Sequence, residues 1–365
     1  MDLKKIKKIS IIAGGTGGHV FPSLSLADYL KKDYKVQLIS DKRGKKYLKH
    51  NHDFEVKIIS SSTIFTKNLL KVLISLIKIS FSFLVSMFDF IISRPKIVIG
   101  MGGYLSFPVC LAAFFLRIPI IIYENNLIIG RTNKFLSPFV KKILVSTSDV
   151  KGIPKKFNYK VFTCGYLLRN DIFEISRQEF KTNKSELSVL ITGGSQSAKI
   201  FGEKIPNIIK QCSENKIRFT IFQQCMKEQT EDIKKIYENL KLNFELFNFS
   251  ENLFEYYKKA DLVITRSGAS SLAELVNLKI PFIAIPLPSS VDNHQFQNAL
   301  YFKNKKYCFL LEEKYISEKL YNILKDLNAD RNQLIKFQQK MNNHSDGDTL
   351  TKIKKLITKT LNEPN

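Results

Sequence analysis

The feature that most constrains the fold is a near-repeat between the two halves of the chain. Residues 10–18 read Ser-Ile-Ile-Ala-Gly-Gly-Thr-Gly-Gly, and residues 189–197 read Val-Leu-Ile-Thr-Gly-Gly-Ser-Gln-Ser. Each is a short apolar run, typical of a buried strand, that ends in a glycine turn and leads into a helical pattern. Because 365 residues exceed what one hydrophobic core normally serves, the repeat predicts two domains of similar build.

Short apolar runs alternate with amphipathic stretches throughout both halves. This alternation is typical of parallel sheets covered by helices, so the predicted fold class is α/β with two sheets. Such folds bind ligands at the carboxyl ends of their strands, and two domains favour a site between them. Residues 151–160 are interpreted as part of the connection between the halves, and residues 350–361 as a basic amphipathic helix. The further apolar runs are 36–40, 97–100, 119–123, 143–146, 219–222, 262–265 and 281–286.

The charge of the chain is strongly positive. It carries 57 Lys and Arg against 33 Asp and Glu, a formal +24, of which +14 falls in residues 1–150. Such an excess indicates a polyanionic partner, either nucleic acid or an acidic membrane surface. The alternative is compositional drift in an AT-rich genome, because only nine of the 57 are Arg and Trp is absent. The concentration of charge in the first 150 residues is the more informative observation.

Five scattered cysteines show no C-x-x-C pair. An odd number without metal-ligand spacing indicates free thiols in a reducing compartment. The basic N-terminus is followed by an apolar run that soon ends in glycines, which predicts a strand rather than a signal peptide. We therefore expect a cytoplasmic protein.

The densest glycine cluster is Gly14-Gly15-Thr16-Gly17-Gly18-His19. Four glycines let the backbone approach a ligand, and the following helix can direct its N–H groups at a phosphate. The cluster matches neither a Walker A loop nor G-x-G-x-x-G. A tight turn explains one or two of the glycines but not four. His19 is a candidate catalytic residue, although a single histidine can also be purely structural.

Two further loops are predicted at the same sheet edge. Residues 100–108, Gly-Met-Gly-Gly-Tyr-Leu-Ser-Phe-Pro, follow one apolar run, and residues 123–126, Tyr-Glu-Asn-Asn, follow another. Asparagines after a strand are often plain turn formers. Three polar or glycine-rich loops at one edge nevertheless favour a pocket.

The second half contains a strand that ends in a loop of small residues, Thr265-Arg266-Ser267-Gly268, before a helix. Ser271 and Glu274 fit the capping-box rule, which explains both residues structurally. A helix N-terminus rich in Ser and Gly is equally suited to a diphosphate. Residues 292–295, Asp-Asn-His-Gln, form a later polar cluster, for which capping by Asp292 or Asn293 is the simple explanation.

Taken together, the motifs GGTGGHVFPSLSLA, GMGGYLSFP, ENN, GRTNK, TGGSQSA, TRSGASSLAEL, IPFIAIPLP and DNHQ, in this order over residues 9–299, resemble the MurG family. These enzymes transfer N-acetylglucosamine from its UDP ester to lipid I in peptidoglycan synthesis. The resemblance implies a GT-B glycosyltransferase with two Rossmann-like domains facing across a cleft. Residues 1–165 would form the acceptor- and membrane-facing domain and 166–344 the donor domain, with a helix at 345–362 packing back on the first.

The resemblance also implies roles for individual residues. An acceptor 4-hydroxyl would attack C1 of the sugar as UDP leaves, with inversion, and His19 or Glu124 would take the proton. An imidazole, whose ordinary pKa is ~6.5, suits this role. No cofactor is implied, and no D-x-D pair lies beside the glycine loops, which agrees with a metal-independent reaction. The implied UDP-N-acetylglucosamine contacts are Thr16, Gly17, Gly18, Asn126, Arg169, Ser195, Ser250, Ala269, Ser270, Ser271, Leu272, Ala273, Glu274 and Gln295.

The chain departs from the family pattern at three positions. Tyr123 stands where the family usually has His, Asn125 where it has Gln, and Ser197 where it has Gly. Tyr123 removes one titratable candidate and shifts the weight toward His19. Ser197 indicates a backbone that does not need a positive φ there.

A lipid acceptor gives the basic first half a purpose. Residues 65–84 combine aliphatic and aromatic side chains with spaced lysines, too interrupted for a confident transmembrane span. One interpretation is a helix packed on the sheet with solvated lysines. The other is an interfacial surface on anionic headgroups, which predicts a peripheral protein on the cytoplasmic face of the bacterial inner membrane. The residues predicted to meet membrane or acceptor are Lys67, Lys71, Leu73, Ile77, Lys78, Phe81, Gly103 and Tyr104.

Three other functions remain open from the sequence. A nucleic-acid-binding protein would explain the charge, but the chain lacks an RRM-type motif, zinc spacing or an Arg-rich stripe, so no nucleic-acid partner is expected. A UDP-N-acetylglucosamine 2-epimerase could share the architecture and the nucleotide site. A glycosyltransferase acting on another lipid acceptor is the nearest alternative.

Overall fold

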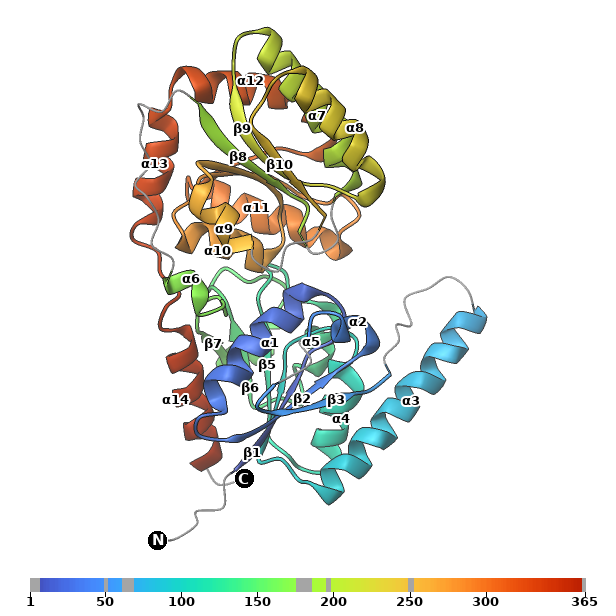
Figure 1. Cartoon of the computed structure of the whole chain (residues 1–365). Coiled ribbons are helices and arrows are strands. Elements are labelled where there is room, and N and C mark those ends of the chain that lie inside the picture. The colour runs from blue at the N-terminus through green and yellow to red at the C-terminus, as the bar shows by residue number, and fades with distance from the viewer. Residues whose placement is uncertain are drawn as a thin grey trace. The chain divides into compact units, whose positions relative to one another are not determined.

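The computed structural model describes residues 7–48, 52–60, 69–174, 186–194, 198–248 and 253–362. The chain divides into two compact units, each described here by itself (Figure 1). The N-terminal unit comprises Met1–Arg169 together with Asp346–Asn365, and the C-terminal unit comprises Asn170–Ser345. Residues 151–160, interpreted from the sequence as part of the connection, instead lie inside the N-terminal unit. They lead through a 3-10 helix, η1 (Lys155–Lys160), into its last strand.

The N-terminal unit is built on a parallel sheet in the order β3-β2-β1-β4-β5-β6-β7. The order reverses at β1, which pairs with β2 on one side and β4 on the other. Ile12 is in register with both Ile39 and Gly100, so these three strands end at one level. In α/β sheets this switch point is where ligands bind. The strands are β1 (Lys8–Ile12), β2 (Lys35–Ser40), β3 (Glu55–Ile58), β4 (Ile97–Gly100), β5 (Ile120–Glu124), β6 (Lys142–Val145) and β7 (Val161–Thr163).

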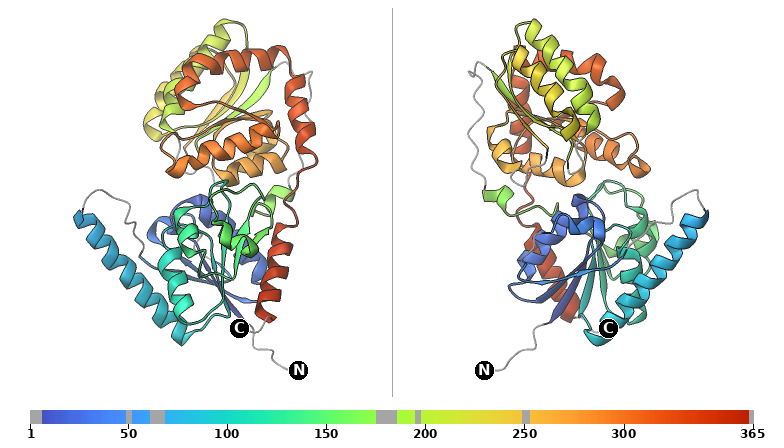
Figure 2. Two further views of the ribbon diagram at one scale, coloured as in Figure 1. Left: turned by 180° about the vertical axis from the view of Figure 1, so that it is seen from behind. Right: turned by 45° about the vertical axis from the view of Figure 1, so that its right-hand side comes forward.

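Helices cover both faces of this sheet and create two apolar cores. On one face, α1 (Gly17–Leu30) and α14 (Thr349–Asn362) pack over side chains such as Ile11 and Leu38. On the other, α4 (Ser106–Phe115) and α3 (Leu69–Ile92) pack over Ile12 and Ile39. Figure 2 shows α14 and α3 on opposite sides of the sheet. Two short helices, α2 (Lys42–Lys45) and α5 (Arg131–Leu136), follow β2 and β5.

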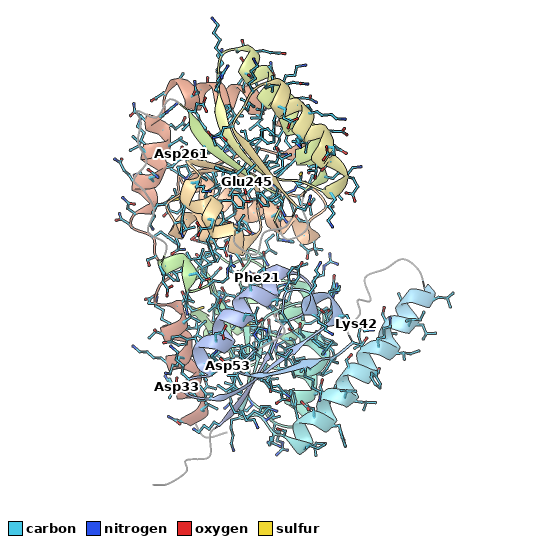
Figure 3. All side chains as sticks on the ribbon, in the orientation of Figure 1. Phe21, Asp33, Lys42, Asp53, Glu245 and Asp261 are labelled. Carbon is cyan, nitrogen blue, oxygen red and sulfur yellow. The ribbon has the colours of Figure 1, made fainter. Side chains whose placement is uncertain are left out.

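The C-terminal helix α14 belongs structurally to the N-terminal unit. Asp346 accepts a hydrogen bond from the Tyr166 amide at 2.9 Å, and the Thr349 hydroxyl donates to the Cys164 carbonyl at 3.0 Å. Ile353 is fully buried in the core shared with α1. At the surface, Lys354 pairs with Asp33 at 2.6 Å; Figure 3 labels Asp33. The last helix therefore completes the core on this face of the sheet.

Helix α3 buries small polar residues and exposes large apolar ones, the reverse of the usual pattern for a helix packed on a protein. Its small polar residues Ser75, Ser82 and Ser86 are buried, and Ser86 donates to the Ser82 carbonyl at 2.7 Å. Its large apolar residues are exposed instead. By length and composition, residues 72–92 could cross a membrane, although little of this stretch is buried. The exposed residues on the helix are Leu70, Leu73, Ile74, Leu76, Ile77, Phe81, Leu84, Phe88, Ile91 and Ile92.

The C-terminal unit repeats the architecture with a parallel sheet in the order β10-β9-β8-β11-β12-β13. Thr265 is in register with Thr192, and Arg266 with Ile285, so β8, β11 and β12 also end together. The strands are β8 (Leu187–Thr192), β9 (Phe219–Gln224), β10 (Phe244–Phe247), β11 (Leu262–Arg266), β12 (Phe282–Ile285) and β13 (Cys308–Leu310). The helices are α6 (Asp171–Glu174), α7 (Lys199–Glu214), α8 (Thr230–Asn239), α9 (Leu253–Lys259), α10 (Ala269–Asn277), α11 (His294–Asn304), α12 (Ile316–Ala329) and α13 (Asn332–Met341).

Two predictions about the elements are confirmed: the two parallel α/β sheets, and the free state of all five cysteines, each of which is buried. Burial raises the pKa of the Cys110 thiol to about 12, so it is an inert core residue.

Replacing Ile353 by Ala should destabilise the N-terminal unit by about 2–4 kcal/mol, because the change opens a cavity in a closed core. Since two units preclude a single two-state transition, the measurement is hydrogen exchange of peptides from β1 and α1. Lys355→Ala, at an exposed position of the same helix, is the control and should change stability by no more than about 0.5 kcal/mol. Unchanged protection of the β1 peptides in the Ile353 variant would contradict the packing.

Candidate active site

The glycine loop after β1 is held by a buried carboxylate that the sequence analysis did not single out. Asp41, only 2% exposed, follows β2 and accepts hydrogen bonds from the Gly15 amide at 3.0 Å and the Gly44 amide at 2.8 Å. Its second oxygen binds the Arg43 guanidinium at 3.0 Å. Gly15 has φ +90°, which favours glycine. The loop is thus fixed through its backbone.

The turn after β4 fits against this loop without room for a side chain. A Cβ atom on Gly103 would lie 2.6 Å from the Gly14 carbonyl oxygen, and one on Gly102 would lie 2.9 Å from the His19 ring. Both residues have positive φ values, +91° for Gly102 and +80° for Gly103. Consequently the half-buried His19 ring lies directly against the second glycine turn. Thr16 and Gly18 beside it are exposed and accessible to a ligand.

Glu124 ends β5 and organises the third loop. Its carboxylate, 3% exposed, accepts four hydrogen bonds. One oxygen binds the amide and the side chain of Asn126, both at 3.0 Å, and the other binds the Gly130 amide at 2.8 Å and the Asn133 side chain at 2.9 Å. A carboxylate has about four lone-pair positions, so these donors occupy all of them. This geometry suits a residue that positions Asn126 better than a proton acceptor.

The neighbours of Glu124 have different roles. Asn125 donates to the Gly18 carbonyl at 3.1 Å and so connects the third loop to the first. Tyr123 is buried in the core, and its hydroxyl accepts a hydrogen bond from the Leu167 amide at 2.9 Å. Burial raises the pKa of the Tyr123 phenol well above its ordinary value. Tyr123 is therefore a core residue, whereas Asn125 belongs to the loops that the structure brings together.

Two further predicted residues lie on the N-terminal unit. The Arg169 guanidinium lies 5.4 Å from the ring centroid of Phe21 on α1, which Figure 3 labels. Tyr104, in the second glycine turn, faces the Arg43 guanidinium at 5.7 Å. The resemblance places Arg169 in the donor domain, residues 166–344, whereas the structure groups it with the N-terminal unit.

In the C-terminal unit, the capping-box interpretation of Ser271 and Glu274 is wrong. The helix α10 begins at Ala269, with Gly268 as its cap and no side-chain hydrogen bond to its first turn. Ser271 is already the third helical residue, and Glu274 accepts a hydrogen bond from the Tyr257 hydroxyl at 3.4 Å. The extended backbone of Gly268 starts the helix earlier than the pattern suggested. Gly268 thus supplies no side-chain cap to the first turn of α10, and a helix N-terminus of this kind is suited to an anion.

Gln295 connects two loops at this edge. Its side-chain oxygen accepts hydrogen bonds from the Ser267 amide at 3.2 Å, after β11, and from the Leu287 amide at 3.0 Å, after β12. Capping by Asp292 or Asn293 is not what the structure shows. Both have positive φ, +51° and +55°, and α11 begins without a side-chain cap. These two residues form a tight turn that leads into Gln295.

Gln224, the last residue of β9, holds the loop after β8 through its side-chain oxygen. Its side-chain oxygen accepts from the Thr192 hydroxyl and from the Gly193 amide, both at 3.0 Å. Gly194 follows with φ +77° and open space around its Cβ position. The predicted contacts Ser195 and Ser250, the departure at Ser197, the predicted membrane residue Lys67 and the side chain of Lys71 lie outside the described residues.

The residues missed by sequence reasoning share one signal. Asp41, Gln224 and Glu313 are polar residues near the ends of strands, and Glu313 forms an ion pair with Arg266. A polar residue where a buried strand ends is well placed to accept backbone amides of the next loop. In the part of the chain that the structure describes, no group of three His, Cys, Asp or Glu could hold a metal ion.

Two family signatures match the chain. The glycosyltransferase family 28 N-terminal domain matches residues 9–145, and the C-terminal domain of the same family matches residues 188–358. A UDP-N-acetylglucosamine–N-acetylmuramyl-(pentapeptide) pyrophosphoryl-undecaprenol N-acetylglucosamine transferase from Pelagibacter ubique is 35% identical over 358 residues, 98% of this chain and 99% of the relative. One with the same name from Rickettsia felis is 39% identical over 338 residues, 88% and 91% of the two chains. The chain belongs to the MurG family of family 28 glycosyltransferases.

Solved structures agree with the MurG assignment. Acinetobacter baumannii MurG superimposes with a TM-score of 0.77 at 25% identity, covering 97% of this chain and 99% of that one. A UDP-GlcNAc 2-epimerase from Neisseria meningitidis bound to UDP-GlcNAc gives a TM-score of 0.64 at 14% identity, covering 96% and 100%. At that identity the epimerase shows a shared fold alone. The predicted fold class, two Rossmann-like α/β domains of the GT-B type, is confirmed.

Replacing Glu124 by Gln should loosen the third loop rather than remove a base. A side-chain NH2 group would face two N–H donors, which costs about 1–3 kcal/mol locally. Hydrogen exchange of peptides within residues 125–133 should accelerate, and the pH dependence of kcat should keep its shape. Glu203→Gln, a change at a surface ion pair of α7, is the control for loss of a carboxylate. A variant with normal loop exchange and a missing ionisation in the kcat profile would instead identify Glu124 as the base.

Proposed function

We propose that this MurG-family protein transfers N-acetylglucosamine from UDP-N-acetylglucosamine to the 4-hydroxyl of the N-acetylmuramyl-pentapeptide of lipid I, forming lipid II. The observation that carries this function is the near full-length match to relatives of that activity, 35% identical over 98% of the chain. In the reaction, the acceptor oxygen forms a bond to C1 of the sugar with inversion. The C1–oxygen bond to UDP breaks, UDP leaves with the electron pair, and a base takes the hydroxyl proton.

The C-terminal unit supplies the proposed donor site. The amides of Ala269, Ser270 and Ser271 lie at the N-terminus of α10, where the helix dipole favours a diphosphate as negative charge develops on the leaving UDP. Leu272, Ala273 and Glu274 follow on the same helix. The side-chain oxygen of Gln295 holds the neighbouring loop, and its side-chain NH2 group is proposed to bind the sugar. Ser195 and Ser250 remain proposed contacts from the resemblance.

The glycine loops of the N-terminal unit supply further proposed contacts to UDP-N-acetylglucosamine, and Gly103 and Tyr104 of the second loop are proposed to meet the acceptor. Thr16, Gly17 and Gly18 present backbone at the start of α1, and Asn126 is held by Glu124. Arg169, stacked over Phe21, is proposed to neutralise charge on the UDP. His19 is the proposed base. Its ring is held against Gly102 on one side, and Glu124 is occupied by its four donors.

Helix α3 is the proposed contact with the membrane. Its serine face packs on the protein and its apolar face is exposed, which suits a helix lying in the interface of a bilayer. Lys78 is exposed on this helix and forms no ion pair with the described residues, so it is available to anionic headgroups. Exposed Phe115 on α4 extends the apolar surface, and its ring packs edge-on against that of Phe83 with centroids 5.7 Å apart. The proposed location is the cytoplasmic face of the bacterial inner membrane.

The packing of α3 favours lying on the membrane over crossing it. Asp89 pairs with Lys57 of β3 at 2.5 Å, and Ser82 donates a hydrogen bond to the carbonyl of Ser60, two residues after β3. A spanning helix would have to give up these contacts with the N-terminal sheet. The packing interpretation and the interfacial interpretation of this segment therefore hold together, one on each face of the helix.

The transfer is tested with labelled UDP-N-acetylglucosamine, lipid I and unrelated lipid acceptors. Label should enter lipid I, and NMR of the donor without acceptor should show no epimer.

In the same assay, His19→Ala should lower kcat by roughly 100-fold or more with little change in the donor KM, because general base catalysis contributes about that much. His344→Gln, outside the proposed site, is the control. An active His19→Ala enzyme with a normal pH profile would reject the assignment of the base.

Membrane attachment is tested by flotation with anionic liposomes. A triple variant, Leu73→Ser, Ile77→Ser and Phe81→Ser, should bind at least about 100-fold more weakly, because three exposed apolar side chains no longer enter the bilayer. Its folding should be unchanged, since all three residues are exposed. Tyr159→Ser, Phe173→Ser and Val291→Ser remove three exposed apolar residues elsewhere and serve as the control. Absence of wild-type binding at every salt concentration would overturn the peripheral attachment.

A further inference from the structure

A cavity of about 730 Å³ lies between α2 and the strand β3 in the N-terminal unit. Its volume is within the range of ~300–1,000 Å³ that is common for small-molecule sites. The strand β3 is at the edge of the sheet, and among the described residues it pairs only with β2. Its outer edge therefore offers backbone N–H and C=O groups to an added strand.

The two faces of β3 are used differently. Glu55 and Lys57 point to one face, where Glu55 binds Gln37 at 2.7 Å and Lys57 binds Asp89 of α3 at 2.5 Å. Successive side chains of a strand alternate, so Val56 and Ile58 point to the opposite face. Both line the cavity and are 36% and 38% exposed. One face of this strand is thus occupied by the protein, while the other is available.

The cavity also carries uncompensated positive charge. Lys42 and Lys45 of α2 line it together with Lys46, which follows the helix, and neither Lys42 nor Lys45 forms an ion pair with any described residue. Figure 3 labels Lys42 at the start of α2. His52 stacks on Phe54 with ring centroids 4.8 Å apart, and its buried Nε2 atom has no hydrogen-bond partner in the described structure. Lysine ammonium groups beside an apolar surface fit a ligand that combines carboxylates with small apolar groups.

The position of the cavity indicates which ligand this is. Lys42 directly follows Asp41, whose carboxylate binds the Gly15 amide of the first glycine loop. An extended peptide of five residues spans roughly 17 Å, enough to run from a sugar at that loop along the edge strand. Phe54 packs in the core shared with α1 and α14, on the face of the sheet opposite the α3 core. A headgroup bound under α3 would therefore not reach this cavity.

We infer that the cavity binds the peptide of the muramyl acceptor, with β3 pairing along its backbone and Lys42 and Lys45 holding its terminal carboxylate. This inference rests on the proposed function, in which the acceptor carries a pentapeptide. A peptide attached through its amino end retains a carboxylate at the other end, which matches the charge of α2. The cavity then distinguishes acceptors with the complete peptide from those without it.

The test compares Lys42→Gln/Lys45→Gln with Lys32→Gln/Lys35→Gln, a control that removes the same charge from exposed positions of the same unit. Each is assayed with a water-soluble lipid I analogue and with the same analogue lacking its peptide. The cavity variant should raise the KM for the peptide-bearing acceptor roughly five- to tenfold, as two exposed charge pairs allow, with kcat and the donor KM unchanged. The KM for the peptide-free acceptor should not change, and the control should match the wild type with both.

Three results would overturn the inference: an unchanged KM for the peptide-bearing acceptor, an equal rise for both acceptors, or an effect confined to liposome flotation. The last would assign the lysines to lipid headgroups. A wild type that transfers to neither acceptor would contradict the proposed function instead. In that case titration of the free pentapeptide decides, because binding that is weakened by amidation of its carboxyl end and by the cavity variant would still support the peptide site.

Discussion

Two buried carboxylates hold the loops on which the N-terminal site depends. Asp41 and Glu124 stand at the carboxyl edge of one parallel sheet, and each accepts backbone amides from the loop beside it. A loop of this kind has amides that no strand or helix pairs, and an anionic acceptor stabilises them more than a neutral one. Once the first loop is fixed, the glycine turn after β4 can approach it without a Cβ atom between them, and the His19 ring is held in place.

Helix α3 has an exposed apolar face that no described part of the protein covers. Buried serines allow the helix to pack on the protein, while exposed Leu, Ile and Phe side chains remain in contact with water in the isolated chain. Exposed apolar patches of this size are unfavourable unless something covers them. In the proposed function, a bilayer interface covers them and supplies anionic groups for Lys78. The same helix thus links the N-terminal core, through Phe90, to the proposed membrane surface.

Much of this was predictable from periodicity and glycine spacing, because parallel sheets require apolar strands and open turns at one edge. The resemblance predicted the family, which the comparisons confirm. The role of Glu124 was not predictable, since its donors Asn126, Gly130 and Asn133 meet only after folding. Ser271 and Glu274 satisfied a capping rule that Gly268 overrides by starting the helix early. The strand at residues 55–58 could not be predicted from continuous apolar runs, because these residues alternate between an ion-paired face and an exposed apolar face.

The pairing of lysines in the N-terminal unit changes how the net charge is understood. If the lysines were only compositional drift, they would be expected either to find partners or to be scattered in solvent. Lys31 and Lys57 meet that expectation, because they are ion-paired with Asp53 and Asp89. Lys42 and Lys45 do not, because they line one cavity together and form no ion pair with the described residues. Unpaired like charges on one short helix repel each other, so their grouping has a cost that an anionic ligand would remove. Local pairing, rather than the total of +24, therefore indicates where this chain meets its anionic partners.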